Sequence, residues 1–373
     1  AYVDLVQSYG AVILGHAHPV VTAALRAAAA DGTSYGAPTP REMKLAELIS
    51  ERVPSCERVR FMNSGTEATS TAVRLARGAT GRSRVVIFNG NFHGATDALL
   101  AAGGSGVATL GLPGTAGVPA EAVANTIVAP YNVVPELDER VAAVIVEPVA
   151  ANMGVVAPAP GFLEGLRAEC DRVGALLVFD EVITGFRLGS SGAQGRFGVR
   201  PDLTCFGKVI GGGLPIGALG GRRDVMENLS PLGTVFHAGT LAGNPMATAA
   251  GLAALGQLDA AAYEEIERRA KRLVSIIDGA ASRAGSSIRT TRVGTLVGLY
   301  LGDGLPQGRT PKDFDEAKTT DEKLYARVFH ALLGAGVAMA PGAYEALFVG
   351  LGHDDSVLDE LERRFDAALS SLG

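Results

Sequence analysis

The sequence predicts an α/β protein whose larger domain is built on a doubly wound, mostly parallel sheet. The first observation is a set of short, apolar and β-branched runs, typical of fully buried strands, at 84–89, 141–147, 175–180 and 203–207. The second is that helical segments separate these runs, as in a sheet with helices on both faces. The third is the length of 373 residues, which exceeds what one hydrophobic core usually organises, so we expect a second domain.

The helices of the larger domain carry start and stop signals. A helix over 65–78 follows Ser64, a residue type that is favoured as N-cap. A helix over 160–173 starts with a Pro-Gly pair and ends before Gly174, which suits the position just after a helix. These signals place the helices between the predicted strands.

The last third of the chain has a different pattern. A long helix with a polar face (261–284) leads to the strand-like run TLVGLYLG, and two further helices follow at 321–335 and 355–370. This pattern predicts a smaller α+β domain. We expect an N-terminal segment of the small domain at 1–32, the large domain at 33–258 and the C-terminal small domain at 259–373.

The chain opens at Ala1, without a methionine, directly in the strand-like AYVDLV, and we expect that further residues precede it in the natural protein. The segment 101–119 is rich in Gly, Ala and Pro, which suits a mobile loop rather than a helix or strand. We consider this segment both as a lid over the active site and as an ordinary surface loop.

The composition limits the classes of function. Hydrophobic residues make up 47% and charged residues 19%, the profile of an ordered globular protein. The net charge of -6 and the pI of about 5.6 give no general attraction to nucleic acid or to acidic membranes. No apolar run approaches the length of a membrane span, and nothing signals export. The three cysteines are odd in number and share no metal-like spacing, so we expect thiols in the cytoplasm and no metal.

Asp180 ends a buried apolar strand. A carboxylate in this position is costly unless a cation meets it. A protonated pyridine nitrogen is such a cation, because the carboxylate raises its proton affinity and the cationic ring then accepts electrons from a substrate carbanion. The alternative is a structural aspartate that caps the next helix or forms an ion pair.

Lys208 follows the next apolar strand and precedes three glycines, Gly211–Gly213. Burial lowers the pKa of a lysine and makes it a nucleophilic amine that can form a Schiff base. The alternative is a surface lysine before a glycine-rich turn. An aspartate after one strand and a lysine with three glycines after the next together favour a pyridoxal 5′-phosphate (PLP) site over both alternatives.

Two further features fit such a site. Ser64, Gly65 and Thr66 stand at a helix start, where free amides and the positive end of the helix dipole attract phosphate. A simple helix cap is the alternative. Phe92, beside His93 after the strand 84–89, is a candidate for stacking on a flat cofactor, and an ordinary core phenylalanine is the alternative.

At these residues the sequence resembles the fold-type I, class III PLP-dependent aminotransferases. The resemblance runs over nearly the whole chain and includes the blocks NSGTEA, DEVITGFR and GKVIGGG, which are specific to the class. The blocks GSGVATLG, EPVAANMG and PGAYEALFVGLGHDD are specific to its aminomutase branch, which moves an amino group within glutamate 1-semialdehyde.

The resemblance implies PLP as the cofactor, with the pyridoxamine 5′-phosphate form in the cycle. It implies that Lys208 forms the Schiff base and shuttles protons, that Asp180 pairs with the pyridine nitrogen and that Glu345 borders the substrate. The residues it places around the cofactor are Ser64, Gly65 and Thr66 at the phosphate, Phe92 over the ring, His93, Asn152 near the ring oxygen, and Val182.

Other implied residues lie at the substrate or the subunit boundary. Ser105 belongs to a gating loop, Tyr9 and Phe236 to the substrate region, and Thr240 reaches the cofactor phosphate of the second subunit in a homodimer. Tyr9 stands where the family commonly has tryptophan, while Phe92 and Phe236 stand where it commonly has tyrosine. An N-terminal arginine that the family is thought to use for the substrate carboxylate has no counterpart in this sequence.

Two other functions remain open from the sequence. An intermolecular transaminase usually offers an arginine from its C-terminal domain to the second substrate's carboxylate, but no Arg or Lys occurs between Arg327 and Arg363. Phe92 and Phe236 keep a specialised transaminase in consideration. A non-catalytic binding protein on this fold is the other alternative, and the intact Asp180–Lys208 pair argues against it.

Overall fold

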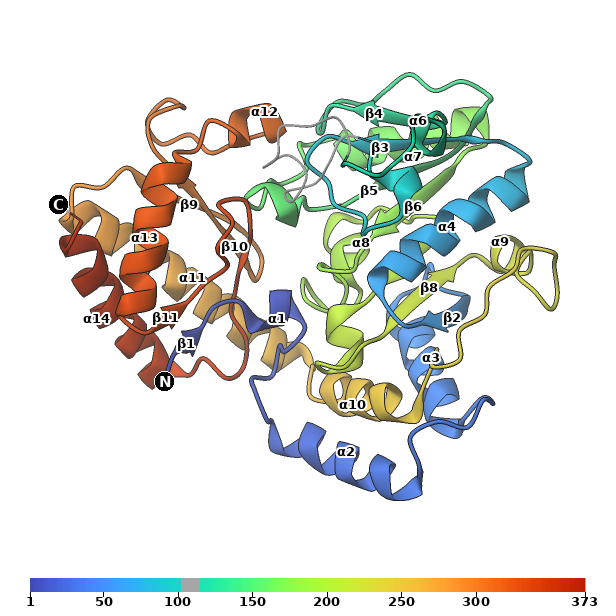
Figure 1. The fold of residues 1–373 in the computed structure, drawn as a ribbon, viewed down its shortest axis with the longest axis horizontal. Helices are drawn as coiled ribbons and strands as arrows, with labels where there is room; N and C mark the ends of the chain where they lie inside the picture. The colour runs from blue at the N-terminus through green and yellow to red at the C-terminus, as the bar shows by residue number, and fades with distance from the viewer. Residues whose placement is uncertain (102–114, 373) are drawn as a thin grey trace.

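The computed structural model describes residues 1–101 and 115–372 and contains two units, each built around a sheet (Figure 1). The larger unit has a seven-stranded sheet. In spatial order its strands are β2 (Arg58–Met62), β8 (Gly217–Gly221), β7 (Leu203–Phe206), β6 (Leu176–Asp180), β5 (Val141–Val146), β3 (Arg84–Phe88) and β4 (Thr126–Ala129).

The strands β7, β6, β5, β3 and β4 run parallel, and β8 runs antiparallel to both of its neighbours. All four strands predicted from the apolar runs are therefore confirmed, and so is the mostly parallel α/β sheet. The strands β5, β6 and β7 are completely buried, which explains why their sequences show no alternation between polar and apolar residues.

Helices cover both faces of this sheet, as Figure 1 shows. The longer ones are α3 (Pro40–Arg52), α4 (Gly65–Thr80), α7 (Phe162–Val173) and α10 (Pro245–Leu255), and the short ones are α6 (Ala120–Val123), α8 (Gly192–Phe197) and α9 (Arg223–Met226). The helix α2 (Pro19–Asp31) packs against α10 (Figure 1). Ser64 caps α4 by accepting a hydrogen bond from the Glu67 amide, and Gly174 ends α7 in the left-handed conformation. The predicted helix signals are confirmed.

The second unit contains β9 (Ile288–Val293), β10 (Leu296–Leu301) and β12 (Leu347–Phe348), which pair antiparallel, and the helices α11 (Ala260–Arg283), α12 (Phe314–Ala317), α13 (Glu322–Gly334) and α14 (Asp355–Ser370). The three helices predicted in this region, at 261–284, 321–335 and 355–370, are confirmed. The N-terminal β1 (Val3–Asp4) pairs with β11 (Val337–Ala338) of this unit. The division of the chain into domains at residues 32 and 258 stays a prediction.

The carboxyl ends of the parallel strands meet at one edge of the large sheet, and short helical turns follow several of them. These turns are η1 (Asp97–Leu99), η2 (Ala151–Met153) and η3 (Lys208–Gly211). The short α1 (Gln7–Gly10) lies between the second unit and the large sheet (Figure 1). Ligands of doubly wound sheets bind at this edge, so it is where a site is expected. Ser105 and most of the segment 101–119 lie outside the described residues.

Candidate active site

Two adjoining cavities open at the carboxyl-end edge of the large sheet. The first has a volume of about 420 Å³ and the second about 360 Å³, and both are lined by Phe92, Asn152, Ile183 and Lys208. The first lies against the sheet, and its other lining residues include Ser64, Gly65, Thr66, His93, Glu147, Asp180 and Val182. The second lies toward the small unit, with Tyr9, Glu345 and Phe348 in its wall. The sizes are in the range of a cofactor site with a substrate site beside it.

Asp180 is the last residue of β6 and is buried in the floor of the first cavity. One carboxylate oxygen accepts a hydrogen bond from His93 Nδ1 at 2.8 Å, and the other accepts one from the Val182 amide at 3.1 Å. These bonds fix the orientation of the carboxylate. The other ring nitrogen of His93, Nε2, is buried without a hydrogen-bond partner.

Lys208 follows β7 and opens η3 with φ of 50°, in the left-handed region that non-glycine residues rarely adopt. Burial lowers the pKa of its amine to about 8, and the negative charges of Glu147, Asp180 and Glu345 oppose that shift. Gly212 allows this backbone path, because its φ is 56° and a Cβ there would lie 2.5 Å from the Ala250 carbonyl oxygen. The strand end and the glycine-rich turn therefore deliver a buried, nucleophilic amine.

The start of α4 closes another side of the first cavity. Ser64 and Thr66 both line it, and the hydroxyl of Thr66 accepts a hydrogen bond from the Ala95 amide at 3.3 Å. Gly65 is needed for close packing, because a Cβ there would lie 2.8 Å from the Val182 side chain. Ser64 is a helix cap, as one alternative held, and it also borders the cavity; a phosphate role for this helix start stays a prediction.

Glu147 is a functional candidate that the sequence reasoning missed. It follows β5 and is buried, and its carboxylate accepts hydrogen bonds from the Phe92 amide at 2.6 Å, the Ala151 amide at 3.1 Å and the Asn152 side-chain amide at 3.0 and 3.1 Å. Burial raises the pKa of this carboxyl to about 7. The signal was present in the sequence, since Glu147 ends an apolar strand in the same way as Asp180.

The cavity walls bring together most of the predicted residues but not all. Tyr9 and Glu345 line the second cavity, and Phe92, which is 40% exposed, lines both cavities. Phe236 is 69% exposed and Thr240 is also exposed, and neither contributes to the two cavities in the chain as described. Ser105 falls among the residues that are not described.

The residues of the first cavity fit PLP. The carboxylate of Asp180 suits a protonated ring nitrogen, the amine of Lys208 suits the aldehyde, and the α4 start suits the phosphate. In residues 1–101 and 115–372 no group of three or more His, Cys, Asp and Glu side chains is placed to hold a metal ion. The fit to PLP rests on Asp180, Lys208 and the start of α4, which together line the first cavity.

Comparison with known sequences gives the family. The pattern that describes the family "Aminotransferase class-III" matches residues 1–348. A glutamate-1-semialdehyde 2,1-aminomutase of Syntrophobacter fumaroxidans is 52% identical over 366 residues, covering 96% of this chain and 83% of the relative. The protein of the same name from Roseiflexus castenholzii is 50% identical over 379 residues, covering 100% and 86%.

Comparison with solved structures agrees. An omega-transaminase from Sphaerobacter thermophilus superposes with a TM-score of 0.91 at 33% identity, covering all of this chain and 87% of that one. A variant of a glutamate-1-semialdehyde aminomutase from Pseudomonas aeruginosa, in complex with pyridoxamine phosphate, gives a TM-score of 0.87 at 26% identity, covering 100% and 84%. Both similarities extend over the whole chain.

Proposed function

The chain belongs to the class III aminotransferase family, and from that premise we propose that it is a PLP-dependent aminomutase that converts glutamate 1-semialdehyde into 5-aminolevulinate for tetrapyrrole synthesis. The observation that carries the proposal is identity of about half, over nearly the whole chain, to proteins named for that reaction. The complete Asp180–Lys208 site supports it, because a non-catalytic relative has no use for a buried, neutralisable amine.

PLP, when bound, supplies an electron-withdrawing ring and alternates between aldehyde and amine forms, so that one nitrogen can leave and another can enter. The side chains of the protein hold the reacting groups in place and move protons. The amine of Lys208, with its lowered pKa, would carry a proton between the two carbons bonded to the transferred nitrogen, one of the substrate and one of the cofactor. Asp180 keeps the proton on the ring nitrogen, and His93 holds Asp180 in place.

The remaining residues of the first cavity hold the cofactor in our proposal. Ser64, Gly65 and Thr66 receive the phosphate at the start of α4, where amides and the helix dipole favour an anion. Phe92 would stack on the ring, and Val182 would border it. Asn152 donates to the ring oxygen, and Glu147 fixes the orientation of that amide.

The second cavity takes the substrate in our proposal, with Glu345 and Tyr9 along its length. A reaction that exchanges two amino positions of one molecule must retain that molecule between its two halves. We assign this retention to the segment 101–119, with Ser105, which lies largely outside the described residues.

We also propose a homodimer in the cytoplasm. The segment that carries Thr240 exposes Leu232, Phe236 and Leu241 by 71%, 69% and 52%, a concentration of apolar surface that suits coverage by a second copy. In that arrangement Thr240 serves the cofactor of the partner. The three cysteines are buried free thiols, as expected in a reducing compartment. No described helix has the length and apolar character that a membrane span requires.

The test of the function uses the purified protein loaded with pyridoxamine phosphate. We expect glutamate 1-semialdehyde to be converted to 5-aminolevulinate with no added amino donor or acceptor. Lys208→Ala is the control and should be inactive. Turnover that depends on a keto acid would contradict the proposal and establish a transaminase instead. Light scattering on the same preparation tests the dimer, and an active monomer would exclude the role given to Thr240.

A second candidate is an intermolecular transaminase for an ω-amino or other specialised substrate. The similarity to the Sphaerobacter omega-transaminase favours it. Against it, Lys208 is the sole lysine or arginine among the described residues that line the two cavities, so a dicarboxylate co-substrate finds no arginine there. The donor-free assay separates the two candidates.

A further inference from the structure

A strained turn forms part of the active-site wall. Three consecutive non-glycine residues, Gln7, Ser8 and Tyr9, have φ values of 46°, 53° and 52°, in the left-handed region. This conformation costs roughly 1–2 kcal/mol for each such residue. Strain of this kind persists only where the surrounding structure enforces it, and it concentrates at functional sites. The contacts around α1 must therefore hold these residues in the left-handed conformation.

Arg187 holds the end of the turn. Its guanidinium donates from Nη2 to the Gly10 carbonyl oxygen at 2.7 Å and from Nη1 to the Val349 carbonyl oxygen at 3.1 Å. It also lies over the Phe348 ring, 5.1 Å from the centroid. One side chain thus ties the last residue of the turn to the small unit next to β12.

Gly10 shows how closely these groups approach. Its φ is 90°, and a Cβ there would lie 2.6 Å from the Phe348 ring and 3.2 Å from Arg187 Nε. At the other end of the turn, Gln7 is buried, its amide donates to Asp4 Oδ1 at 3.1 Å, and its side-chain nitrogen lies 3.4 Å from His353 Nδ1. Both ends of the turn are anchored by buried contacts.

Burying the charged side chain of Arg187 costs more free energy than a purely structural contact requires. It is completely buried, it forms no ion pair with any residue in the described part of the chain, and its Nε has no hydrogen-bond partner. Burial lowers the pKa of the guanidinium to about 9, which leaves it charged at neutral pH. A buried charge without an ion pair is destabilising, so its presence here indicates a role that an apolar side chain cannot fill.

The turn presents its two central residues to the active site. Ser8 lines the first cavity, and Tyr9 lines the second together with Lys208, Glu345 and Phe348. The charge of Arg187 also reaches Lys208, where it favours the neutral amine and so opposes the effect of the three neighbouring carboxylates. Arg187 itself lines neither cavity, so it acts through other groups.

We propose that Arg187 is a positioning residue for this reaction: it holds the left-handed turn Gln7–Gly10 against β12 and thereby fixes Ser8 and Tyr9 in the wall that faces Lys208. The inference deepens the proposed function, on which its kinetic part rests. Its structural part concerns the turn alone and holds for whichever substrate the site accepts.

The test reads the turn directly. The chain has no tryptophan, so Tyr9→Trp places the only tryptophan of the chain in the turn. In this background, in the PLP-loaded enzyme, we expect Arg187→Met to raise acrylamide quenching by about twofold, because the released turn exposes the indole. We expect kcat/KM to fall by about 10²-fold, the usual cost of a misplacement near 1 Å. The acidic limb of the pH–rate profile should move to higher pH, because the amine of Lys208 loses a neighbouring positive charge.

Arg289→Met is the matched control. Arg289 also lies over an aromatic ring, that of Tyr300, and donates to backbone carbonyl groups of the small unit, but it lines neither active-site cavity. It should leave quenching, kcat/KM and the pH profile unchanged. Equal values for Arg187→Met and Arg289→Met would overturn the proposal.

Two further variants keep the test decisive if Arg187→Met does not fold. Arg187→Lys retains the charge but loses the two-pronged grip, so quenching should rise while the pH profile stays in place. Gly10→Ala pushes against Phe348 with Arg187 intact and should raise quenching and lower kcat/KM. Unchanged quenching in both variants would refute the proposal that Arg187 holds the turn in place. If quenching rises in these variants as expected but the enzyme shows no aminomutase turnover, only the proposed function is refuted.

Discussion

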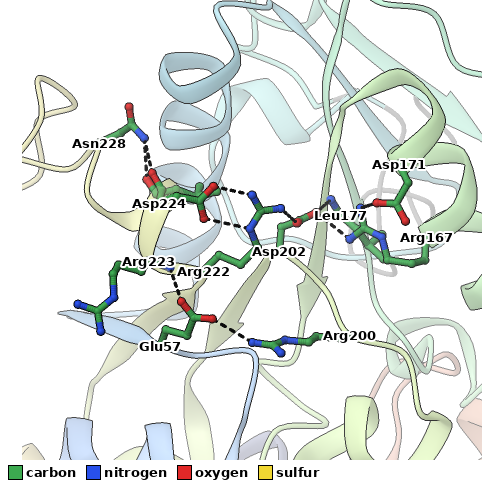
Figure 2. Close-up of polar contacts among 11 residues, drawn as sticks. Glu57, Arg167, Asp171, Leu177, Arg200, Asp202, Arg222, Arg223, Asp224 and Asn228 are labelled. Carbon is green, nitrogen blue, oxygen red and sulfur yellow. Dashed lines mark hydrogen bonds and ion pairs between the residues drawn. The ribbon is translucent and has the colours of Figure 1, made fainter.

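Buried carboxylates lie at both edges of the large sheet, but their partners differ. At the amino-end edge, Asp202 precedes β7 and accepts hydrogen bonds from Arg167 Nη1 at 2.7 Å, Arg222 Nη1 at 2.6 Å and the Leu177 amide at 2.7 Å, as Figure 2 shows. At the carboxyl-end edge, no arginine or lysine of the described chain forms an ion pair with Asp180 or Glu147.

The difference separates a structural charge from a functional one. The charge of Asp202 is compensated by two arginines of the same chain, so it is already neutralised in the folded protein. Asp180 has one histidine and one amide, and Glu147 has only amides, so neither carboxylate is held by an arginine when a cationic group enters the cavity. A folded chain that leaves carboxylates in this state at one edge is prepared to bind a cation there.

The outer members of the amino-end cluster add less. Arg200 and Glu57 are about half exposed, and the Arg222–Asp224 pair has exposed fractions of 43% and 66%, so water and salt screen both pairs (Figure 2). Only the buried centre at Asp202 carries a large part of the stabilisation. The two edges therefore differ mainly in their buried groups, which are Asp202 at the amino-end edge and Asp180, Glu147 and Lys208 at the carboxyl-end edge.

The largest expected effect is at Lys208. Lys208→Ala should lower kcat by at least about 10³-fold, because it removes the proton carrier and the cofactor anchor together. The melting temperature of the protein without cofactor should stay the same or rise, since a buried amine in a strained backbone position is lost. Steady-state kinetics and calorimetry measure the two quantities. A large drop in melting temperature with residual activity would make the carboxyl-end edge structural and remove the contrast.

The second effect is at the opposite edge. Asp202→Asn should lower the free energy of unfolding by about 2–3 kcal/mol, because it leaves two arginines without their shared carboxylate, although both are partly exposed and regain some hydration. The kcat of the folded fraction should change by less than about twofold, since the site lies at the other end of the strands. Urea denaturation and kinetics on one preparation measure both.

Asp224→Asn is the control for this substitution. Asp224 pairs with the same Arg222 but is exposed, so its loss should cost no more than about 0.5 kcal/mol. If the two substitutions were equally destabilising, burial would not be what distinguishes Asp202. If Asp202→Asn abolished activity in folded protein, the two edges would be coupled and the comparison would be wrong.

Much of this contrast was accessible from the sequence. Four buried strands were predicted from apolar, β-branched runs, and the rule that a carboxylate or lysine at the end of such a run needs a partner identified Asp180 and Lys208. The same rule applies to Glu147 at the end of β5 and was not applied to it. The information needed to identify Glu147 was therefore present in the sequence.

Other features have no local signal. The first three residues of the left-handed turn, Gln7, Ser8 and Tyr9, include no glycine or asparagine, the residues that usually mark this conformation. It exists because Arg187 and His353, distant in sequence, reach it in the folded chain. The antiparallel β8 was also not predicted: its sequence, GALGG, lacks β-branched residues, and its pairing with β2 and β7 specifies it instead.

The smallest effect concerns pH and tests the uncompensated charges themselves. Only the neutral amine of Lys208 binds PLP covalently, and the pKa of that amine is about 8. The rate constant for PLP binding to the cofactor-free protein, followed by the visible absorbance band, should therefore rise about tenfold per pH unit below pH 8 and level off above it. A rise that continues to pH 10 would mean that the amine behaves as an ordinary, solvated lysine.

The charges around Lys208 decide where the curve bends. Glu147 raises the pKa of the amine, so Glu147→Gln should move the bend to lower pH, whereas Arg187 lowers that pKa and Arg187→Met should move it to higher pH. Asp202→Asn at the other edge should leave the bend where it is, because its charge is neutralised locally by two arginines. Opposite shifts for the two substitutions at the carboxyl-end edge, with none at the amino-end edge, follow only if the cavity charges act on Lys208 without local compensation. Equal shifts for Glu147→Gln and Asp202→Asn would show that the distinction between the edges has no electrostatic basis.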